Sequence, residues 1–265
     1  MHSATRIALR YLRYYLTASN GKGHGVHSPF VFEFITNVLN DDRRYYCYNS
    51  IEHLRQQSLL DTTVIHIEDL GAGSRVHAFQ ERKISDIAAS SLKSKKFAQL
   101  LFRIAYFYKT KTILELGTSL GITTAYLASA NSNNKVITME GSKAIANVAR
   151  KNFEQLQLKN IEIAEGNFDD TLQSTLEKIS SIDFAFIDGN HRKEPTIRYF
   201  EKLLTKTNAS SILIFDDIHW SKEMEEAWIY IQSHASVTLS IDLFFIGIVF
   251  FRTEQKAKQH FTIRF

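Results

Sequence analysis

Apolar residues in the second half of the chain occur in short runs that alternate with stretches of helical spacing. Each run is typical of a buried strand, and each following stretch has apolar residues three and four positions apart, as on one face of a helix. Strands that alternate with helices of roughly 10–15 residues are typical of right-handed β-α-β units, so we predict an α/β fold with a parallel sheet. The predicted strands are Thr112–Leu116, Lys135–Glu140, Ile161–Ala164, Ile182–Ile187 and Ser211–Phe215.

The alternation ends after the fifth strand and its helix. Two apolar segments, Val237–Phe244 and Phe245–Phe251, then follow each other with no helix between them, which predicts an antiparallel strand pair at one edge of the sheet. Residues His260–Phe265 alternate between polar and apolar positions and predict a further edge strand. An exposed edge of this kind offers a surface for a homodimer.

The first 111 residues have a different pattern. Ser28 and Pro29 are typical of a helix start, and six of the 11 tyrosines lie within residues 11–48. We predict a mainly helical cover over the sheet, and therefore two domains, 1–111 and 112–265. An acidic, glycine-rich turn at residues 68–74 follows the apolar run Val64–Ile67, but no helical face follows it, so we interpret it as a strand and a turn or as a lid segment that contacts the site.

Composition excludes several classes of protein. The chain has 265 residues, of which 44% are hydrophobic and 23% charged, values that are typical of globular domains. The single cysteine, Cys47, excludes a disulfide framework and suits a reducing compartment, so we expect a cytoplasmic protein. A net charge of +4 is too small to argue for nucleic acid, and no apolar run approaches the ~20 residues of a membrane span. We therefore expect neither a nucleic acid nor a membrane as a partner. We interpret Arg6, Arg10 and Arg13 as a solvated helix face.

Acidic residues gather at the predicted carboxyl ends of the strands, where open α/β sheets bind their ligands. The first strand runs into Glu115-Leu-Gly-Thr-Ser-Leu-Gly121, whose spacing differs from the G-x-G-x-x-G of dinucleotide folds and whose acid suits a cationic or amine-bearing ligand. The second ends at Glu140, which can bind both hydroxyls of a ribose. After the third come Asn167 and Phe168, an amide and an aromatic ring that can bracket an adenine.

These motifs carry a family resemblance. The segments ILELGTSLGITTAYLA, ITMEGS, AEGNF, FAFIDGNH and LIFDDIHW resemble the class I S-adenosylmethionine (SAM)-dependent methyltransferases, and more narrowly the small-molecule O-methyltransferase-like group with D-G-x-H and D-D at two strand ends. The resemblance covers about residues 112–251. It implies a Rossmann-like sheet of seven strands, mostly parallel with an antiparallel C-terminal pair, and methyl transfer from SAM to a hydroxyl oxygen of a small molecule. The cofactor-binding set expected on this basis is Glu115, Gly117, Thr118, Ser119, Gly121, Glu140, Gly141, Asn167, Phe168 and Asp188.

The two remaining strand ends carry Asp188, Asp216 and Asp217. Converging carboxylates raise one another's pKa, and a hard divalent ion such as Mg²⁺ relieves that repulsion and lowers the pKa of a bound substrate hydroxyl. The alternative is that these aspartates cap the following helices, but three carboxylates exceed what two caps require. We therefore predict a metal site. Relatives that methylate catechols commonly have Asp-Asn at the fifth strand, so the Asp-Asp of this chain argues against a catechol substrate.

Two histidines, His191 and His219, flank the same predicted face. Either can be the general base, because imidazole titrates near neutral pH. The alternative is that each caps a helix or donates to a neighbouring carboxylate. With Asp188 they form the predicted catalytic set.

Three other functions compete with methyl transfer to oxygen. A nicotinamide-dependent oxidoreductase can use a similar sheet, but the glycine spacing and the antiparallel tail oppose it. Methylation of nucleic-acid amines would require an Asn/Asp-Pro-Pro-aromatic turn where this chain has Asp188-Gly-Asn-His191. The third is a methyltransferase-like binding module without turnover.

Overall fold

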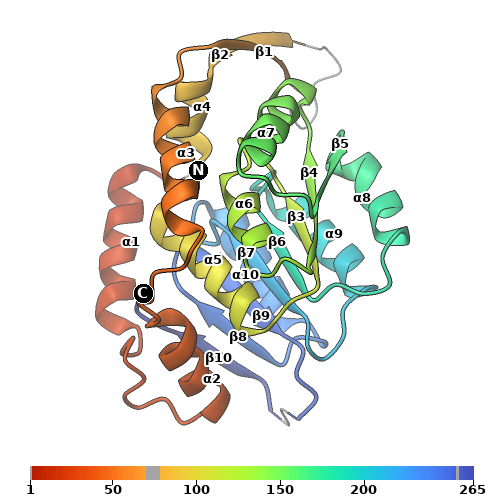
Figure 1. Ribbon diagram of the computed structural model, residues 1–265. Helices are drawn as coiled ribbons and strands as arrows, with labels where there is room; N and C mark the ends of the chain where they lie inside the picture. The colour runs from red at the N-terminus through yellow and green to blue at the C-terminus, as the bar shows by residue number, and fades with distance from the viewer. Residues whose placement is uncertain (1, 70–77, 255–256) are drawn as a thin grey trace. The chain divides into compact units, whose positions relative to one another are not determined.

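The computed structural model describes residues 2–69, 78–254 and 257–265 (Figure 1). Most of the acidic, glycine-rich turn predicted at residues 68–74 lies outside the described residues. None of the helices within these three ranges is both long enough and apolar enough to cross a membrane. The helices are α1 (Ala4–Thr17), α2 (Pro29–Phe34), the π-helix η1 (Ile35–Leu39), α3 (Tyr48–Leu60), α4 (Ile84–Ser91), α5 (Lys95–Phe107), α6 (Ile122–Ser129), α7 (Lys143–Gln155), α8 (Phe168–Glu177), α9 (Lys193–Leu204) and α10 (Lys222–Ser233). The strands are β1 (Val64–Asp69), β2 (Ala78–Lys83), β3 (Thr112–Leu116), β4 (Lys135–Glu140), β5 (Ile161–Glu165), β6 (Phe184–Ile187), β7 (Ile212–Asp216), β8 (Leu239–Asp242), β9 (Ile246–Phe250) and β10 (Gln259–Thr262).

The chain divides into two compact units. One comprises Met1–Asp41 with Ser180–Phe265, and the other comprises Asp42–Ile179. The predicted domains 1–111 and 112–265 were distinguished by their roles rather than by compactness, and they stay a prediction.

In the unit Asp42–Ile179, strands β3, β4 and β5 pair in parallel in that order. Their carboxyl ends therefore lie at one edge, with Leu116 beside Met139 and Glu140 beside Glu165. Strands β1 and β2 form a separate antiparallel hairpin. The sequence pattern missed β2, because its residues lack the alternation of a half-buried strand.

Strand β1 and helix α4 contribute to a small apolar core that includes the loop after β3. Ile67 of β1 and the α4 residues Ile84 and Ile87 cluster with Leu120, which is fully buried. This part of the N-terminal region therefore supports the loop between β3 and α6.

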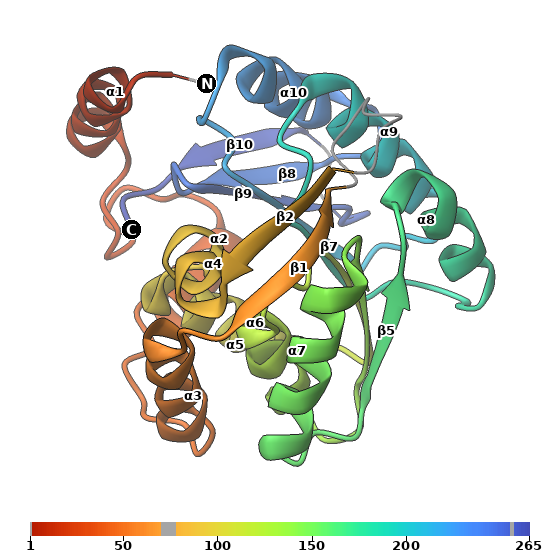
Figure 2. The ribbon, with the colours of Figure 1, turned by 90° about the horizontal axis from the view of Figure 1, so that it is seen from above.

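In the other unit, the strands lie in the order β6-β7-β9-β8-β10. Strands β6 and β7 are parallel, and β9 is antiparallel to both β7 and β8, which confirms the predicted antiparallel pair. The predicted strand Val237–Phe244 is too long, because Phe244 has φ +70° and the chain turns there into β9. Helix α10 lies on one side of β8 and β9 and α2 on the other (Figure 2), with Trp228 against Gly247 and Phe34 against Phe250.

The outer edge of this unit is partly covered by its own N-terminal segment. Strand β10 pairs in parallel with β8, and the amide of Ser19 donates to the carbonyl of Thr262 at 2.8 Å. The amide of Arg264 in turn donates to the carbonyl of Ser19 at 3.0 Å. The helix start predicted at Ser28 is confirmed, since its hydroxyl accepts a hydrogen bond from the amide of Val31 and caps α2.

Candidate active site

The loop between β3 and α6 is fixed by backbone hydrogen bonds to the end of β4. The amides of Gly117 and Thr118 both donate to the carbonyl of Met139, at 3.0 and 3.1 Å. Gly121 precedes α6 with φ +80°, and a Cβ atom there would lie 2.5 Å from the ring of Phe153. The turn therefore needs glycine at this position for its backbone angle and for the close approach of α7.

Glu140, at the end of β4, holds this loop in place. One carboxylate oxygen accepts a hydrogen bond from the amide of Ser119 at 2.9 Å, and the other accepts one from the amide of Ser142 at 2.9 Å. Ser119 has φ +48°, a conformation that costs energy outside glycine and that the bond to Glu140 stabilises. Burial raises the pKa of Glu140, while the amides of Ser142, Ser119 and Gly141 oppose that shift.

Glu115 lies deeper, fully buried in β3. Its Oε2 accepts hydrogen bonds from the hydroxyls of Thr124 at 2.5 Å and Thr138 at 2.6 Å. No donor among the described residues reaches its buried Oε1, and the same holds for the buried hydroxyl of Ser119. Burial raises the pKa of Glu115 to about 7, against the opposing effect of the two threonines. Unmatched buried polar atoms are uncommon in proteins, so two of them close together in sequence, one in β3 and one in the loop after it, call for an explanation such as a bound ligand.

The turn after β5 approaches Glu140 as well. The amide of Gly166, with φ +123°, donates to the carbonyl of Glu140 at 2.9 Å. Asn167 then caps α8, since its Oδ1 accepts a hydrogen bond from the amide of Asp169 at 3.0 Å, and Phe168 is the first residue of the helix. The amide oxygen of Asn167 is thus engaged within the protein, which leaves its NH₂ group for a ligand.

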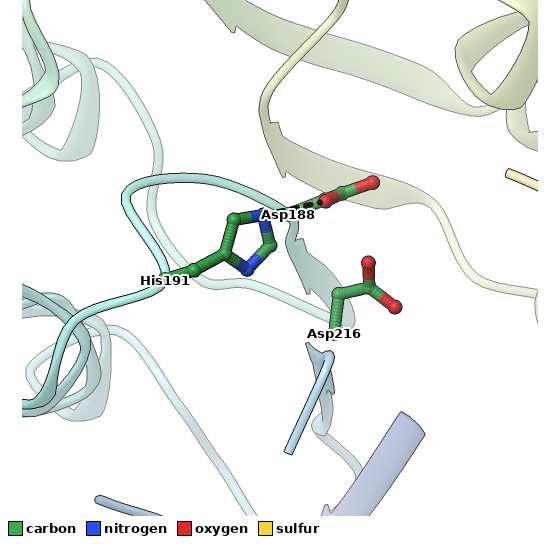
Figure 3. A group of neighbouring side chains, drawn as sticks. All are labelled: Asp188, His191 and Asp216. Atoms are coloured by element: carbon green, nitrogen blue, oxygen red, sulfur yellow. Dashed lines mark ion pairs between the residues drawn. The ribbon is translucent and has the colours of Figure 1, made fainter. Parts of the chain in front are cut away.

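The ends of β6 and β7 bring together a second set of residues, Asp188, His191 and Asp216 (Figure 3). The two strands pair with Ile187 opposite Phe215, so the aspartates that follow them are neighbours. One ligand atom from each of the three side chains lies within 4.8 Å of the other two. His191 Nε2 is 3.5 Å from Asp188 Oδ1, and Asp216 is buried whereas the other two are half-buried.

The backbone explains why His191 is in this set and Asp217 is not. Asn190 and His191 have φ +67° and +25°, and the side chain of Asn190 donates to the hydroxyl of Tyr199 at 3.1 Å. This left-handed turn carries His191 back toward Asp188. Asp217 has φ +53°, its amide donates to the carbonyl of Phe245 at 2.7 Å, and its carboxylate is not among the three converging groups.

The donor set fits a divalent cation. Two carboxylates supply the oxygen ligands that Mg²⁺ prefers, and an imidazole nitrogen suits softer ions such as Zn²⁺. The residues that can hold an ion are therefore Asp188 and Asp216, with His191 as a third donor or as a base beside it.

His219 lies in a different environment from His191. Its Nε2 is 2.8 Å from Asp242 Oδ2 and its Nδ1 is 3.4 Å from Glu225 Oε1. Both ring nitrogens of His219 therefore already face carboxylates within the protein. This arrangement favours the alternative in which His219 donates to neighbouring carboxylates.

Sequence reasoning missed the residues around His219. Asp242 is a charged residue within an apolar run, a pattern that signals a buried partner, whereas Glu225 sits in a helix of ordinary composition. The interpretation of the arginine stripe as a solvated face is wrong for Arg10, because its guanidinium forms an ion pair with Glu225. That contact joins residues 215 positions apart, which no local pattern can predict.

The comparisons with known proteins agree with this geometry. Residues 114–218 match the family model described as a methyltransferase domain. The predicted resemblance to the class I SAM-dependent methyltransferases and the predicted Rossmann-like fold are thus confirmed.

Individual relatives give the same picture. The chain is 32% identical over 126 residues to a catechol O-methyltransferase from Niastella koreensis, and the match covers 46% of this chain. The chain spans only 55% of that relative's length.

Solved structures show the fold over most of the chain. An O-methyltransferase from Bacillus cereus in complex with SAH is 20% identical with a TM-score of 0.56, covering 83% of this chain and 97% of that one. An SAH-bound methyltransferase from Podospora anserina is 12% identical with a TM-score of 0.60, covering 85% and 97%. An O-methyltransferase from Streptomyces achromogenes in complex with SAM is 18% identical with a TM-score of 0.54, covering 61% and 82%.

Proposed function

We propose that the protein transfers the methyl group of SAM to a hydroxyl oxygen of a small molecule, with the assistance of a divalent metal. The observation that carries the proposal is the end of β3 and the loop that follows it, which Glu140 holds and where two buried polar atoms, Glu115 Oε1 in the strand and Ser119 Oγ in the loop, have no partner among the described residues. This loop lies within the segment that matches the methyltransferase family, and structural neighbours carry SAM or SAH.

The residues around the loop have the chemistry to bind each part of SAM. Gly117 and Gly121 allow the backbone to approach the methionine part, and the hydroxyl of Ser119 offers a hydrogen bond to it. Glu140 already receives one amide on each oxygen, which fixes its carboxylate for the two ribose hydroxyls. Asn167 and Phe168 serve the adenine, through the free NH₂ group and the ring. Glu115, Thr118, Gly141 and Asp188 complete the proposed cofactor set.

The proposed reaction is a direct displacement. His191 accepts the proton of the substrate hydroxyl, and the oxygen attacks the methyl carbon of the sulfonium. The carbon–sulfur bond breaks, and its electron pair stays on sulfur. The products are a methyl ether, SAH and one proton on the base.

Asp188 and Asp216 are the residues that would hold the ion. When bound, a divalent cation supplies positive charge that lowers the pKa of the substrate hydroxyl. Because Mg²⁺ prefers oxygen ligands, the imidazole of His191 stays available as the base. We assign no catalytic role to His219, and Asp217 contributes to the site through its backbone.

Ligand-dependent stability tests this function against its alternatives. Binding to the folded state adds about 2.7 kcal/mol to the free energy of unfolding at a ligand concentration of 100 times Kd. We expect SAH to raise the melting temperature and NAD(H) to leave it unchanged, and Mg²⁺ to add a shift that EDTA removes. The opposite pattern would identify a nicotinamide enzyme. A shift with SAH but no methylated product from a panel of hydroxylated small molecules, catechol included, would indicate a binding module without turnover.

The remaining expectations concern the roles of the two predicted domains, the cellular location and the oligomeric state. We propose that residues 1–111 act as a cover that selects the substrate, while residues 112–265 bind SAM. A cytoplasmic location and a homodimer are further proposals, and native mass spectrometry tests the second. A mass of one chain at micromolar concentration would exclude the dimer.

A further inference from the structure

The first helix is attached to the turn that follows β7. The amide of His2 donates to the carbonyl of Trp220 at 3.0 Å. The guanidinium of Arg10 forms an ion pair with Glu225 of α10, and its Nη1 also lies 3.2 Å from His2 Nε2. Burial lowers the pKa of His2, with Arg6 and Arg10 adding to the effect, so its neutral ring can accept a hydrogen bond from Arg10.

From Glu225 the contacts continue to the backbone beside the metal group. Glu225 faces His219 Nδ1, and the other ring nitrogen of His219 faces Asp242. The second oxygen of Asp242 accepts a hydrogen bond from the amide of Phe244 at 2.7 Å. The carbonyl of the next residue, Phe245, accepts a hydrogen bond from the amide of Asp217, the residue directly after Asp216.

Aromatic packing strengthens the same connection. Tyr11 and Tyr14 of α1 lie on Phe244, with ring centroids 5.1 and 5.3 Å apart. The ring of His219 contacts Phe244 from another direction, at 5.2 Å. The hairpin turn between β8 and β9 is therefore held between α1 and the turn that bears Asp216.

These groups are mostly withdrawn from solvent. The exposed fractions of the side chains are 36% for Arg10, 18% for Glu225, 24% for His219 and 12% for Asp242. Removing one member of such a network leaves its partner desolvated and without its counterion, so the remaining groups rearrange. A rearrangement here reaches the turn that carries Asp216.

We propose that Arg10, Glu225 and Asp242 are positioning residues that act through His219 to fix the turn Asp216–His219. In this arrangement, helix α1 sets the geometry of the group Asp188, His191 and Asp216 without touching it. The effect on metal affinity rests on the proposed metal site. The effect on the backbone of the turn does not depend on it.

The direction in which metal affinity changes when Arg10 is replaced distinguishes a positioning role from a simple electrostatic effect. Arg10 is a cation, so its removal would strengthen the binding of a metal cation if charge alone mattered. If Arg10 instead positions the turn, its removal should weaken metal binding. We expect Arg10→Gln and Glu225→Gln each to weaken Mg²⁺ or Mn²⁺ binding about 5-fold or more by isothermal titration calorimetry, with SAH affinity unchanged. The double variant should be no weaker than the stronger single variant, because both changes break one connection.

Arg13→Gln is the matched control, since Arg13 is exposed on the same helix. It should change neither affinity. Hydrogen exchange of the Asp217 amide gives a second readout that needs no metal. We expect faster exchange in Arg10→Gln than in the wild type and in Arg13→Gln, at an unchanged circular dichroism spectrum.

Tighter or unchanged metal binding in Arg10→Gln would overturn the proposal, as would unchanged exchange at Asp217. If the wild-type protein binds no metal, the metal part of the proposed function fails, and the exchange measurement still decides whether Arg10 positions the turn.

Discussion

The two groups of candidate functional residues, one in each compact unit, are built by different means. In the unit Asp42–Ile179, the loop after β3 is fixed by glycines and by backbone hydrogen bonds to the adjacent strand, all close to the strand ends. In the other unit, Asp188, His191 and Asp216 depend on left-handed turns and, as we propose, on contacts from the distant helix α1. The first group can therefore be recognised from a short sequence motif. The arrangement of the second group, as we propose, depends on residues far apart in the chain.

The largest expected effect separates two adjacent aspartates. Asp216→Asn removes a buried carboxylate from the converging group, so we expect Mg²⁺ affinity to fall about 100-fold or more, since loss of even a group that only hydrogen-bonds to a ligand costs about 10- to 100-fold, with SAH affinity retained. Asp217→Asn is the matched control, because its carboxylate is not in that group, and it should lower Mg²⁺ affinity less than 5-fold, or about 1 kcal/mol. Calorimetry on both variants measures this. Equal losses of Mg²⁺ affinity in the two variants would instead support the predicted metal set of Asp188, Asp216 and Asp217.

The next comparison distinguishes a base from a ligand at His191. We expect His191→Asn to lower kcat about 100-fold, as the loss of a general base does, while the Kd for Mg²⁺ stays near that of the wild type. Steady-state kinetics and calorimetry on the same preparation provide both numbers. A rise in the Kd for Mg²⁺ with little change in kcat at saturating metal would make the imidazole a ligand instead.

A pair of glycines tests how the cofactor loop is held. Gly121→Ala combines a left-handed φ with a clash against Phe153, so we expect a loss of about 2–4 kcal/mol in the free energy of unfolding and weaker SAH binding. Gly25 has the same φ of +80° but open space around it. Gly25→Ala should cost only the strain of the backbone, about 1 kcal/mol. Urea unfolding gives both values, and similar costs would mean that the approach of Phe153 has no energetic role.

The smallest effect concerns the pH dependence of stability at Glu115. Because burial raises its pKa to about 7 in the folded protein, the folded state binds this proton more tightly than the unfolded chain. The free energy of unfolding should therefore fall as pH rises from the ordinary pKa of 4.5 toward 7. Glu115→Gln removes this dependence, so the variant should gain stability relative to wild type between pH 5 and pH 8, by at most about 3 kcal/mol.

Unfolding curves at the two pH values measure that difference. Glu154→Gln, on the exposed side of α7, is the control and should show no such gain. A difference that does not vary with pH would mean that Glu115 is already ionised in the folded protein at pH 5.

The sequence was informative where structure follows from local periodicity. The strands that end at Leu116, Glu140 and Asp216 were predicted within one or two residues, because apolar runs and glycine turns set them. The placement of Asp188 beside Asp216 also follows from two adjacent parallel strands.

The sequence was not informative where a backbone angle or a remote contact decides. His191 and Asp217 have positive φ values, and His191 is in the converging group whereas the carboxylate of Asp217 is not; residue types alone do not determine these backbone angles. The pair Arg10–Glu225 and the cover provided by Ser19 at β10 depend on how the N-terminal segment packs within its unit.

The most direct test of the central claim is calorimetric titration of SAH into three proteins: the wild type, Glu140→Ala and Asp216→Asn. We predict that the wild type and Asp216→Asn bind SAH with similar affinity, while Glu140→Ala loses at least about 10-fold in SAH affinity, or about 1.4 kcal/mol. Absence of SAH binding to the wild-type protein, or binding that does not depend on Glu140, would contradict it.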